Sequence, residues 1–360
     1  MIRRPTRARP RATGAHSLSL AIAAVLLALA AAAPACAKKT AANWDTAAQH
    51  AVVQAGVMSE ATPGNFDGAA TLSPASAQQA LAALAAREQA ADEEAETPAA
   101  AAVPTPAVSS TATITVRRFD ALLVDQLGLA ATAAHVEQTA YAAGLQPPSY
   151  FGTEVVARYL GLRYDHPTGE DSLELYPWNP ITRAEAAHSF AVALEQGSWA
   201  VESARETLEA FSLPHYTADQ LQVLRIAVAK IGMPYVWGGT TDGTEDGLEH
   251  GGYDCSGFAW RVYKVSGLPW GAKIVGRTAA EQAGEIPKSA RLRLPSVQPA
   301  DLLFFGSAHF NSTATQANVI HEAIALSAEW AINSSSQGVY VLPLTSGWLA
   351  QQFVWGRRVL

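Results

Sequence analysis

The stretch that decides the fold of the carboxy-terminal part is residues 253–258, Tyr-Asp-Cys-Ser-Gly-Phe. We expect a helix to begin at Cys255 and to continue to about Val265. Unpaired backbone N–H groups and the helix dipole meet at the start of a helix, and both favour a thiolate over a thiol. The position of Cys255 therefore favours a nucleophile over the alternative, a small buried hydrophobic residue.

The cysteine content of the chain supports the same interpretation. Only two cysteines occur, Cys36 and Cys255, and Cys36 belongs to the leader described below. A mature exported chain would therefore hold no intramolecular disulfide. A single cysteine, with a histidine and an asparagine or aspartate elsewhere in the chain, is the pattern of a cysteine nucleophile.

The segments around this stretch predict helices followed by strands. Apolar residues at helical spacing cover residues 218–231, Gly232 ends the pattern, and a polar insert occupies residues 240–252. After a short helix near residues 278–283, apolar or alternating runs predict four or five strands, at residues 301–305, 319–326, 330–334, 339–342 and 353–359. Helices first and an antiparallel sheet afterwards indicate an α+β domain.

Because side chains alternate between the two faces of a strand, a histidine and an amide on neighbouring strands are expected on the same face. His321 and Ala323 share one face of their strand, whereas Glu322 lies on the other. Asn333 follows across a predicted hairpin, where it can share a face with His321. A surface histidine on a strand would give the same pattern, so these two residues alone do not define a site.

Several of these stretches, taken in order, resemble NlpC-type cell-wall peptidases, which are papain-like cysteine enzymes that bacteria secrete to cut the peptide part of peptidoglycan. The resemblance covers residues 219–360. It rests on residues 235–239, 254–258, 277–282 and 299–305, and on His321 with Asn333. The resemblance implies a papain-like α+β fold and no cofactor.

The resemblance also implies roles for individual residues. It makes Cys255 the nucleophile, His321 the general base and Asn333 the residue that orients His321. It places Tyr235 beside the thiol, where its hydroxyl and the backbone N–H of Cys255 could stabilise an oxyanion. Two further residues match substrate-contacting positions, for which helix capping is the alternative: Asp254 and Ser256.

The sequence departs from the family pattern in several places. Glu322 and Ala323 stand where the family usually has Val and Gly, the third polar residue is often His, and the insert at residues 240–252 is long. His250 and His309 are rival bases, one in the insert and one in a predicted loop. No clustered Cys and His pattern indicates a metal site.

The chain begins with a segment typical of a secretory signal peptide, residues 1–37. It has five arginines among the first eleven residues, an apolar run at residues 18–33 and small residues at 33–37. A membrane anchor is the alternative, but the apolar run is shorter than the roughly 20 residues that span a bilayer. Cys36 is either removed with this leader or lipidated. We therefore expect a secreted protein of the cell envelope or wall.

Three helix-loop-helix units are predicted between the leader and the peptidase-like part. Residues 38–112 are alanine-rich and end in a Pro-, Ser- and Thr-rich linker, and residues 113–200 continue the helical pattern. Capped helices are predicted after Leu72, Ile114 and Ile181, and the last has Thr182 as N-cap with Glu185 three residues later, a capping box.

The third unit, residues 151–194, resembles S-layer homology domains, which hold proteins on bacterial cell walls through wall polymers. Residues 182–185 carry that resemblance, which implies a wall-polymer role for Thr182, Arg183 and Glu185. The other two units depart from the family, and an ordinary helical spacer is the alternative for the whole region.

The composition limits the partners. With 25 Lys and Arg against 32 Asp and Glu, the formal net charge is −7, so nucleic acid is an unfavourable partner. We expect an exported cysteine endopeptidase of peptidoglycan stem peptides that cuts the bond from D-glutamate to the diamino acid, with a secondary wall polymer as a second partner. Two alternatives stay open: an inactive wall-binding protein, and an amidase or acyltransferase with the same triad.

Overall fold

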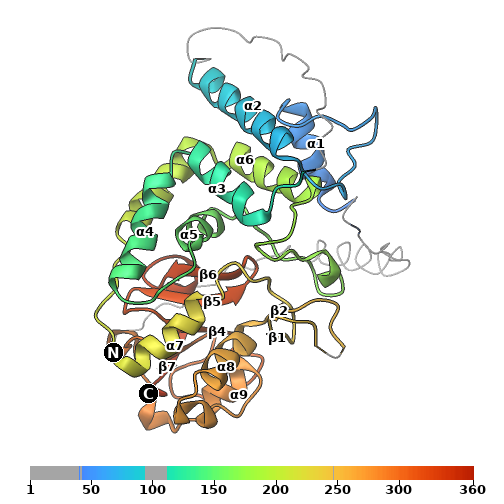
Figure 1. The fold of residues 1–360 in the computed structure, drawn as a ribbon. Helices are drawn as coiled ribbons and strands as arrows, with labels where there is room; N and C mark the ends of the chain where they lie inside the picture. The colour runs from blue at the N-terminus through green and yellow to red at the C-terminus, as the bar shows by residue number, and fades with distance from the viewer. Residues whose placement is uncertain (1–39, 41–42, 94–111, 246) are drawn as a thin grey trace, which may run out of the picture. The chain divides into compact units, whose positions relative to one another are not determined.

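A five-stranded antiparallel sheet organises the carboxy-terminal part of the computed structural model (Figure 1). The structure describes residues 40, 43–93, 112–245 and 247–360, so the predicted leader, with Cys36, and most of the linker lie outside the described residues. The strand order is β6-β5-β4-β3-β7, with bounds β3 Leu302–Phe305, β4 His321–Ala325, β5 Trp330–Ser335, β6 Gly338–Pro343 and β7 Phe353–Arg357. All five predicted strands are present within a few residues of the predicted bounds.

Both faces of the sheet are buried. Successive side chains of a strand point to opposite faces, and each face packs against its own set of residues. One face packs against α8, which contacts both β4 and β5. The other face carries Ala323 and Phe305 and is closed by Leu349. The helices of this part are α7 Ala218–Val228, α8 Cys255–Val265, α9 Ala279–Gly284 and α10 Gly347–Gln352, and a two-stranded ribbon pairs β1 Thr240–Thr241 with β2 Gly252–Tyr253. The predicted α+β class is confirmed.

The part before the sheet domain is helical. Its elements are α1 Thr46–Gln54, α2 Pro74–Glu93, α3 Val116–Gln126, α4 Ala130–Ala142, α5 Phe151–Tyr159 and α6 Arg183–Glu209. We predicted that the last of these helices ends near Leu194, and a break close to that residue divides α6 into two helical segments, the second of which runs to Glu209. The helical geometry of α6 is interrupted at Gly197, where φ is 63°, and the chain resumes a helical path beyond that residue.

The residues before the three predicted capped helices meet in a closed ring of backbone hydrogen bonds. The Leu72 N–H donates to the Ile181 carbonyl (2.9 Å), the Ile181 N–H to the Ile114 carbonyl (2.9 Å), and the Ile114 N–H to the Leu72 carbonyl (3.0 Å). Each of these residues immediately precedes the cap of a helix. The three units therefore occupy equivalent places around one centre.

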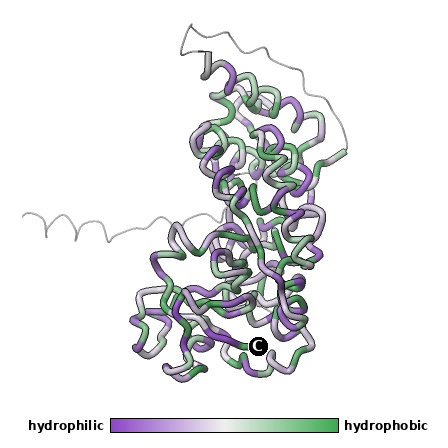
Figure 2. The backbone as a smooth tube through the Cα atoms, turned by 90° about the vertical axis from the view of Figure 1, so that its left-hand side faces the viewer, coloured by the Kyte–Doolittle hydropathy of each residue, from purple (hydrophilic) through white to green (hydrophobic). Residues whose placement is uncertain are grey.

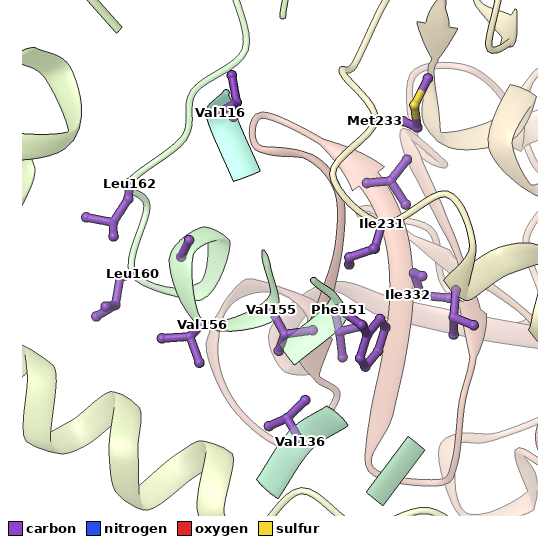
Figure 3. Close-up of a cluster of buried hydrophobic side chains, with 14 of the residues drawn as sticks. Val116, Val136, Phe151, Val155, Val156, Leu160, Leu162, Ile231, Met233 and Ile332 are labelled. Carbon is purple, nitrogen blue, oxygen red and sulfur yellow. The ribbon is translucent and has the colours of Figure 1, made fainter. Parts of the chain in front are cut away.

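The helical region and the sheet domain share one hydrophobic core. Helix α5 packs against β6, and Figure 3 shows Phe151 and Val155 of α5 beside Ile231 and Ile332. At the edge of this core, the buried Arg158 pairs with Glu154 (2.9 Å) and donates to the carbonyl of Gly232 (2.8 Å). The helical region is thus built into the sheet domain rather than joined to it by a free linker.

Hydropathy varies over short distances along the described chain, as the alternating colours of Figure 2 show. Among the described residues, no helix combines the length and the apolar character needed to cross a membrane.

Candidate active site

Cys255 is the first residue of α8, and the chain reaches it from β2. Asp254 caps the helix, because its Oδ1 accepts a hydrogen bond of 2.6 Å from the Gly257 N–H. A Cβ atom at position 257 would lie 2.1 Å from the carbonyl oxygen of Gly239, so only glycine permits this approach. The predicted start of the helix at Cys255 is therefore held by a cap and by close backbone packing.

Arg277 neutralises the carboxylate next to the nucleophile. Its Nη1 lies 2.9 Å from Asp254 Oδ1 and its Nη2 lies 2.9 Å from Asp254 Oδ2, a bidentate pair. Nη1 also donates to Ser256 Oγ, 3.2 Å away. Both predicted substrate-contacting residues, Asp254 and Ser256, are thus engaged within the protein, and Asp254 acts as a helix cap.

Tyr235 lies next to β2, the strand that also pairs with β1. Its backbone forms a parallel bridge with Tyr253, two residues before Cys255. Burial raises the pKa of the Tyr235 hydroxyl, and the negative charges of Cys255 and Asp254 raise it further. A neutral hydroxyl at this position is a hydrogen-bond donor near the thiol.

His321 and Asn333 are in direct contact across β4 and β5. His321 Nε2 lies 2.8 Å from Asn333 Oδ1, and Asn333 Nδ2 donates to the Tyr340 carbonyl (3.2 Å). Because the Asn333 oxygen accepts, Nε2 of His321 carries the proton in the neutral ring and Nδ1 keeps the free electron pair. Burial lowers the pKa of His321 to about 4, and the Asn333 contact opposes that shift.

The thiol of Cys255 is half-buried and lies beside the strand that carries His321. Burial raises its pKa to about 12, the charges of Asp254 and Glu322 add to this, and the backbone N–H groups of Glu322 and Ser256 oppose it. We expected the helix start to favour a thiolate, and this is wrong for the resting protein. Desolvation and two nearby carboxyl groups outweigh the helix dipole, so the Cys255 thiol and the His321 imidazole are both neutral between about pH 4 and pH 12.

Comparison with protein families identifies this part of the chain. Residues 232–358 match the model of the NlpC/P60 family. This segment is similar to NlpC/P60 domains. The resemblance noted in the sequence is confirmed for these residues.

A curated relative matches a segment of similar length. "Probable peptidoglycan endopeptidase LytE" of Bacillus subtilis (strain 168) is 30% identical over 132 residues, which cover 37% of this chain and 32% of that protein. The chain therefore matches about a third of the length of this relative. The S-layer homology resemblance of the helical region has no counterpart among these matches.

Three residues of the NlpC/P60 domain take part in the site without having been predicted. Arg277 was quoted only as part of a motif, and Trp348 packs edge-on against His321 with ring centroids 5.7 Å apart. Glu322 is fully buried, and neither of its carboxyl oxygens has a hydrogen-bond partner in the described structure. Burial raises the pKa of Glu322 well above its ordinary value, which favours the neutral form of this carboxyl. The sequence did offer a signal for Glu322, because an acidic residue stands there in the middle of a predicted strand.

The rival histidines have other surroundings. His250 Nδ1 donates to the Gly251 carbonyl (2.7 Å), and its ring lies 4.4 Å from the ring of Tyr176. His309 lies in a loop, where its carbonyl accepts from the Ser312 N–H (2.9 Å). In the described part of the chain, no group of three or more His, Cys, Asp or Glu side chains is arranged to hold a metal ion.

The residues predicted to bind wall polymer are engaged inside the helical region. Thr182 Oγ1 accepts from the Glu185 N–H (3.2 Å), as predicted, but the Glu185 side chain does not complete a capping box. It is buried and pairs instead with His166 (3.0 Å) and Arg163 (3.6 Å), since two buried cations compete for it. Arg183 donates to the backbone carbonyls of Phe66 (2.9 Å) and Ser59 (2.6 Å).

Proposed function

We propose that this protein is a cysteine endopeptidase that hydrolyses peptidoglycan stem peptides, with Cys255 as nucleophile, His321 as general base and Asn333 as the residue that orients His321. The observation that carries the proposal is the hydrogen bond of 2.8 Å between His321 Nε2 and Asn333 Oδ1. The residue after His321 on the same strand, Glu322, contacts the Cys255 thiol through its backbone N–H. A nucleophile, a base and an orienting group in this order support acyl transfer.

The proposed reaction begins with the neutral pair. His321 Nδ1 removes the proton from Cys255 Sγ as the sulfur attacks the carbonyl carbon of the scissile amide, and a tetrahedral oxyanion forms. The backbone N–H of Cys255 and the Tyr235 hydroxyl donate to that oxyanion. His321 then gives the proton to the leaving amine, the C–N bond breaks, and a thioester remains.

Deacylation follows by the same proton relay. His321 Nδ1 takes a proton from water as the water oxygen attacks the thioester carbon. The second tetrahedral intermediate collapses, the carboxylic acid leaves, and Cys255 Sγ recovers the proton from His321. Asn333 holds the imidazole in one tautomer throughout, which keeps Nδ1 available.

The substrate is the bond from D-glutamate to the diamino acid, as the family resemblance implies. An amidase or acyltransferase would use the same nucleophile and base, because these groups set the acyl chemistry and not the acyl donor. The second alternative is an inactive wall-binding protein. The presence of Cys255, His321 and Asn333 argues against it.

The test is digestion of purified peptidoglycan by the full chain, followed by mass spectrometry of the soluble muropeptides. The full chain is needed because the helical region shares the core of the NlpC/P60 domain. New peptide fragments with the wild type, and none with Cys255→Ser, support the proposal. Unchanged muropeptide profiles with folded, reduced wild-type protein contradict it.

The helical region serves, in this proposal, to hold the enzyme on the wall through an anionic secondary polymer. The ring of hydrogen bonds among Leu72, Ile114 and Ile181 supports three equivalent units of the S-layer homology kind. Wall material with and without its secondary polymer, incubated with Cys255→Ser protein, tests this: sedimentation with only the complete wall is expected, and equal sedimentation with both contradicts it.

A further inference from the structure

A half-exposed tryptophan stands beside the imidazole of His321. Trp348 is the second residue of α10, the helix that connects β6 to β7. The next residue, Leu349, is buried against the sheet face formed by Phe305, Ala323 and Ala331, and this contact fixes the helix. Trp348 itself is 48% exposed, so its indole is held in place with an open surface.

Three rings form one cluster around the histidine. The centroids of Trp348 and His321 are 5.7 Å apart at an interplanar angle of 72°, and those of Phe305 and His321 are 5.8 Å apart. Trp348 also contacts Phe305, with centroids 6.2 Å apart. These distances lie within the range of favourable aromatic pairs. Since Asn333 occupies Nε2, the Nδ1 side of the imidazole is the side that remains for a substrate.

The exposed part of the Trp348 indole therefore lies on the expected path of a bound peptide. A proton transfer requires donor and acceptor atoms about 2.6–3.2 Å apart, so the scissile amide must reach the edge of the imidazole. We propose that Trp348 is a substrate-binding wall of the groove, which packs on the aliphatic part of the peptide residue next to the scissile bond and keeps water from His321. The inference rests on the proposed function and specifies the substrate contact of the same site.

The shielding has a measurable electrostatic consequence. Burial is what lowers the pKa of His321, to about 4. Burial and the Asn333 contact are the two causes that act on the His321 pKa, and the rings packed against it, those of Phe305 and Trp348, carry no titratable group. Removal of the indole admits water to the ring, and water stabilises the imidazolium.

The experiment combines two readings on the full chain. NMR titration of the His321 ring, assigned with His321→Gln, gives its pKa, and calorimetry with purified soluble muropeptides in a Cys255→Ser background gives the dissociation constant. Trp348→Ala is expected to raise the His321 pKa by at least one unit toward 6.5 and to weaken binding roughly tenfold. Trp348→Phe keeps a ring and is expected to stay close to the wild type in both readings, which separates loss of the indole from loss of folding.

Trp199, which is 80% exposed on α6, provides the matched control, and Trp199→Ala is expected to change neither reading. An unchanged dissociation constant or an unchanged His321 pKa in Trp348→Ala overturns the inference. Because neither reading needs turnover, a wild type that binds but does not hydrolyse muropeptides contradicts the proposed function and leaves the role of Trp348 supported.

Discussion

Arg158 of α5 donates from Nη2 to the carbonyl oxygen of Gly232, 2.8 Å away, where the helical region meets the NlpC/P60 domain. The same guanidinium donates to the Gln337 carbonyl and pairs with the buried Glu154. Gly232 begins the segment that leads to Tyr235, so a contact from outside the domain holds the backbone just before the site. The helical region is therefore part of what positions the candidate active site.

Arg158→Met should destabilise the whole protein. The change leaves the Glu154 carboxylate buried without its partner, and breaking a buried pair in this way costs about 3–5 kcal/mol. The free energy of unfolding, from denaturant titration of the full chain, measures the effect. Arg205→Met is the control, because its pair with Glu202 is exposed and such pairs contribute about 0–1 kcal/mol. Equal decreases in the free energy of unfolding for the two variants would show that the Arg158 contacts do not stabilise the junction.

Arg277→Met should slow the reaction of the Cys255 thiol. With its bidentate partner gone, Asp254 carries an unneutralised charge beside the sulfur and raises the thiol pKa further. A rise of about one unit slows alkylation by iodoacetamide roughly tenfold at a fixed pH below the pKa. Arg277→Lys keeps the charge but not the bidentate geometry, so an intermediate rate is expected. A rate for Arg277→Met equal to that of the wild type would exclude this electrostatic role.

The contrast between Asn333 and Arg277 shows what the sequence could predict. Strand alternation is a local property, so the shared face of His321 and Asn333 could be predicted, as could the strands and the helix start at Cys255. Arg277 reaches Asp254 from 23 residues away, outside any shared element, and only the folded chain shows it. Trp348 depends in the same way on how α10 docks, which no local pattern encodes.

The thiol pKa shows a second limit. The helix start at Cys255 was predictable, but its electrostatic effect was not, because burial depends on which side chains surround the sulfur. Similarly, Thr182 was correctly predicted as a cap, whereas Glu185 pairs with His166 and Arg163, which lie in the preceding loop. Both differences arise from tertiary contacts that compete with a local preference.

Glu322→Gln should change how stability depends on pH. The folded-state pKa of Glu322 lies well above its ordinary value of 4.5, so the folded protein binds this proton more tightly than the unfolded chain does. The stabilisation is complete below pH 4.5 and is lost as the pH rises through the folded-state pKa. Glutamine does not titrate, so the free energy of unfolding of the variant, relative to the wild type, should increase by up to about 1.4 kcal/mol per pH unit above pH 4.5.

Unfolding titrations of both proteins between pH 4 and pH 8 provide the measurement. Glu202→Gln, an exposed carboxylate on α6, is the control and should run parallel to the wild type. A Glu322→Gln curve that also runs parallel would show that Glu322 is not held in its neutral form.

The identity of the base tests the central claim most directly. The measurement is turnover of purified muropeptides, together with the rate of Cys255 alkylation across pH, for full-length His321→Ala, His250→Ala, His309→Ala and Asn333→Ala. Loss of the base should cost roughly 10²–10⁴-fold in turnover, and Asn333→Ala should cost less, because the proton acceptor remains and only its orientation is lost. His250→Ala and His309→Ala should stay near the wild type. A larger loss from either of these two than from His321→Ala would contradict the assignment of His321, and with it the proposed mechanism.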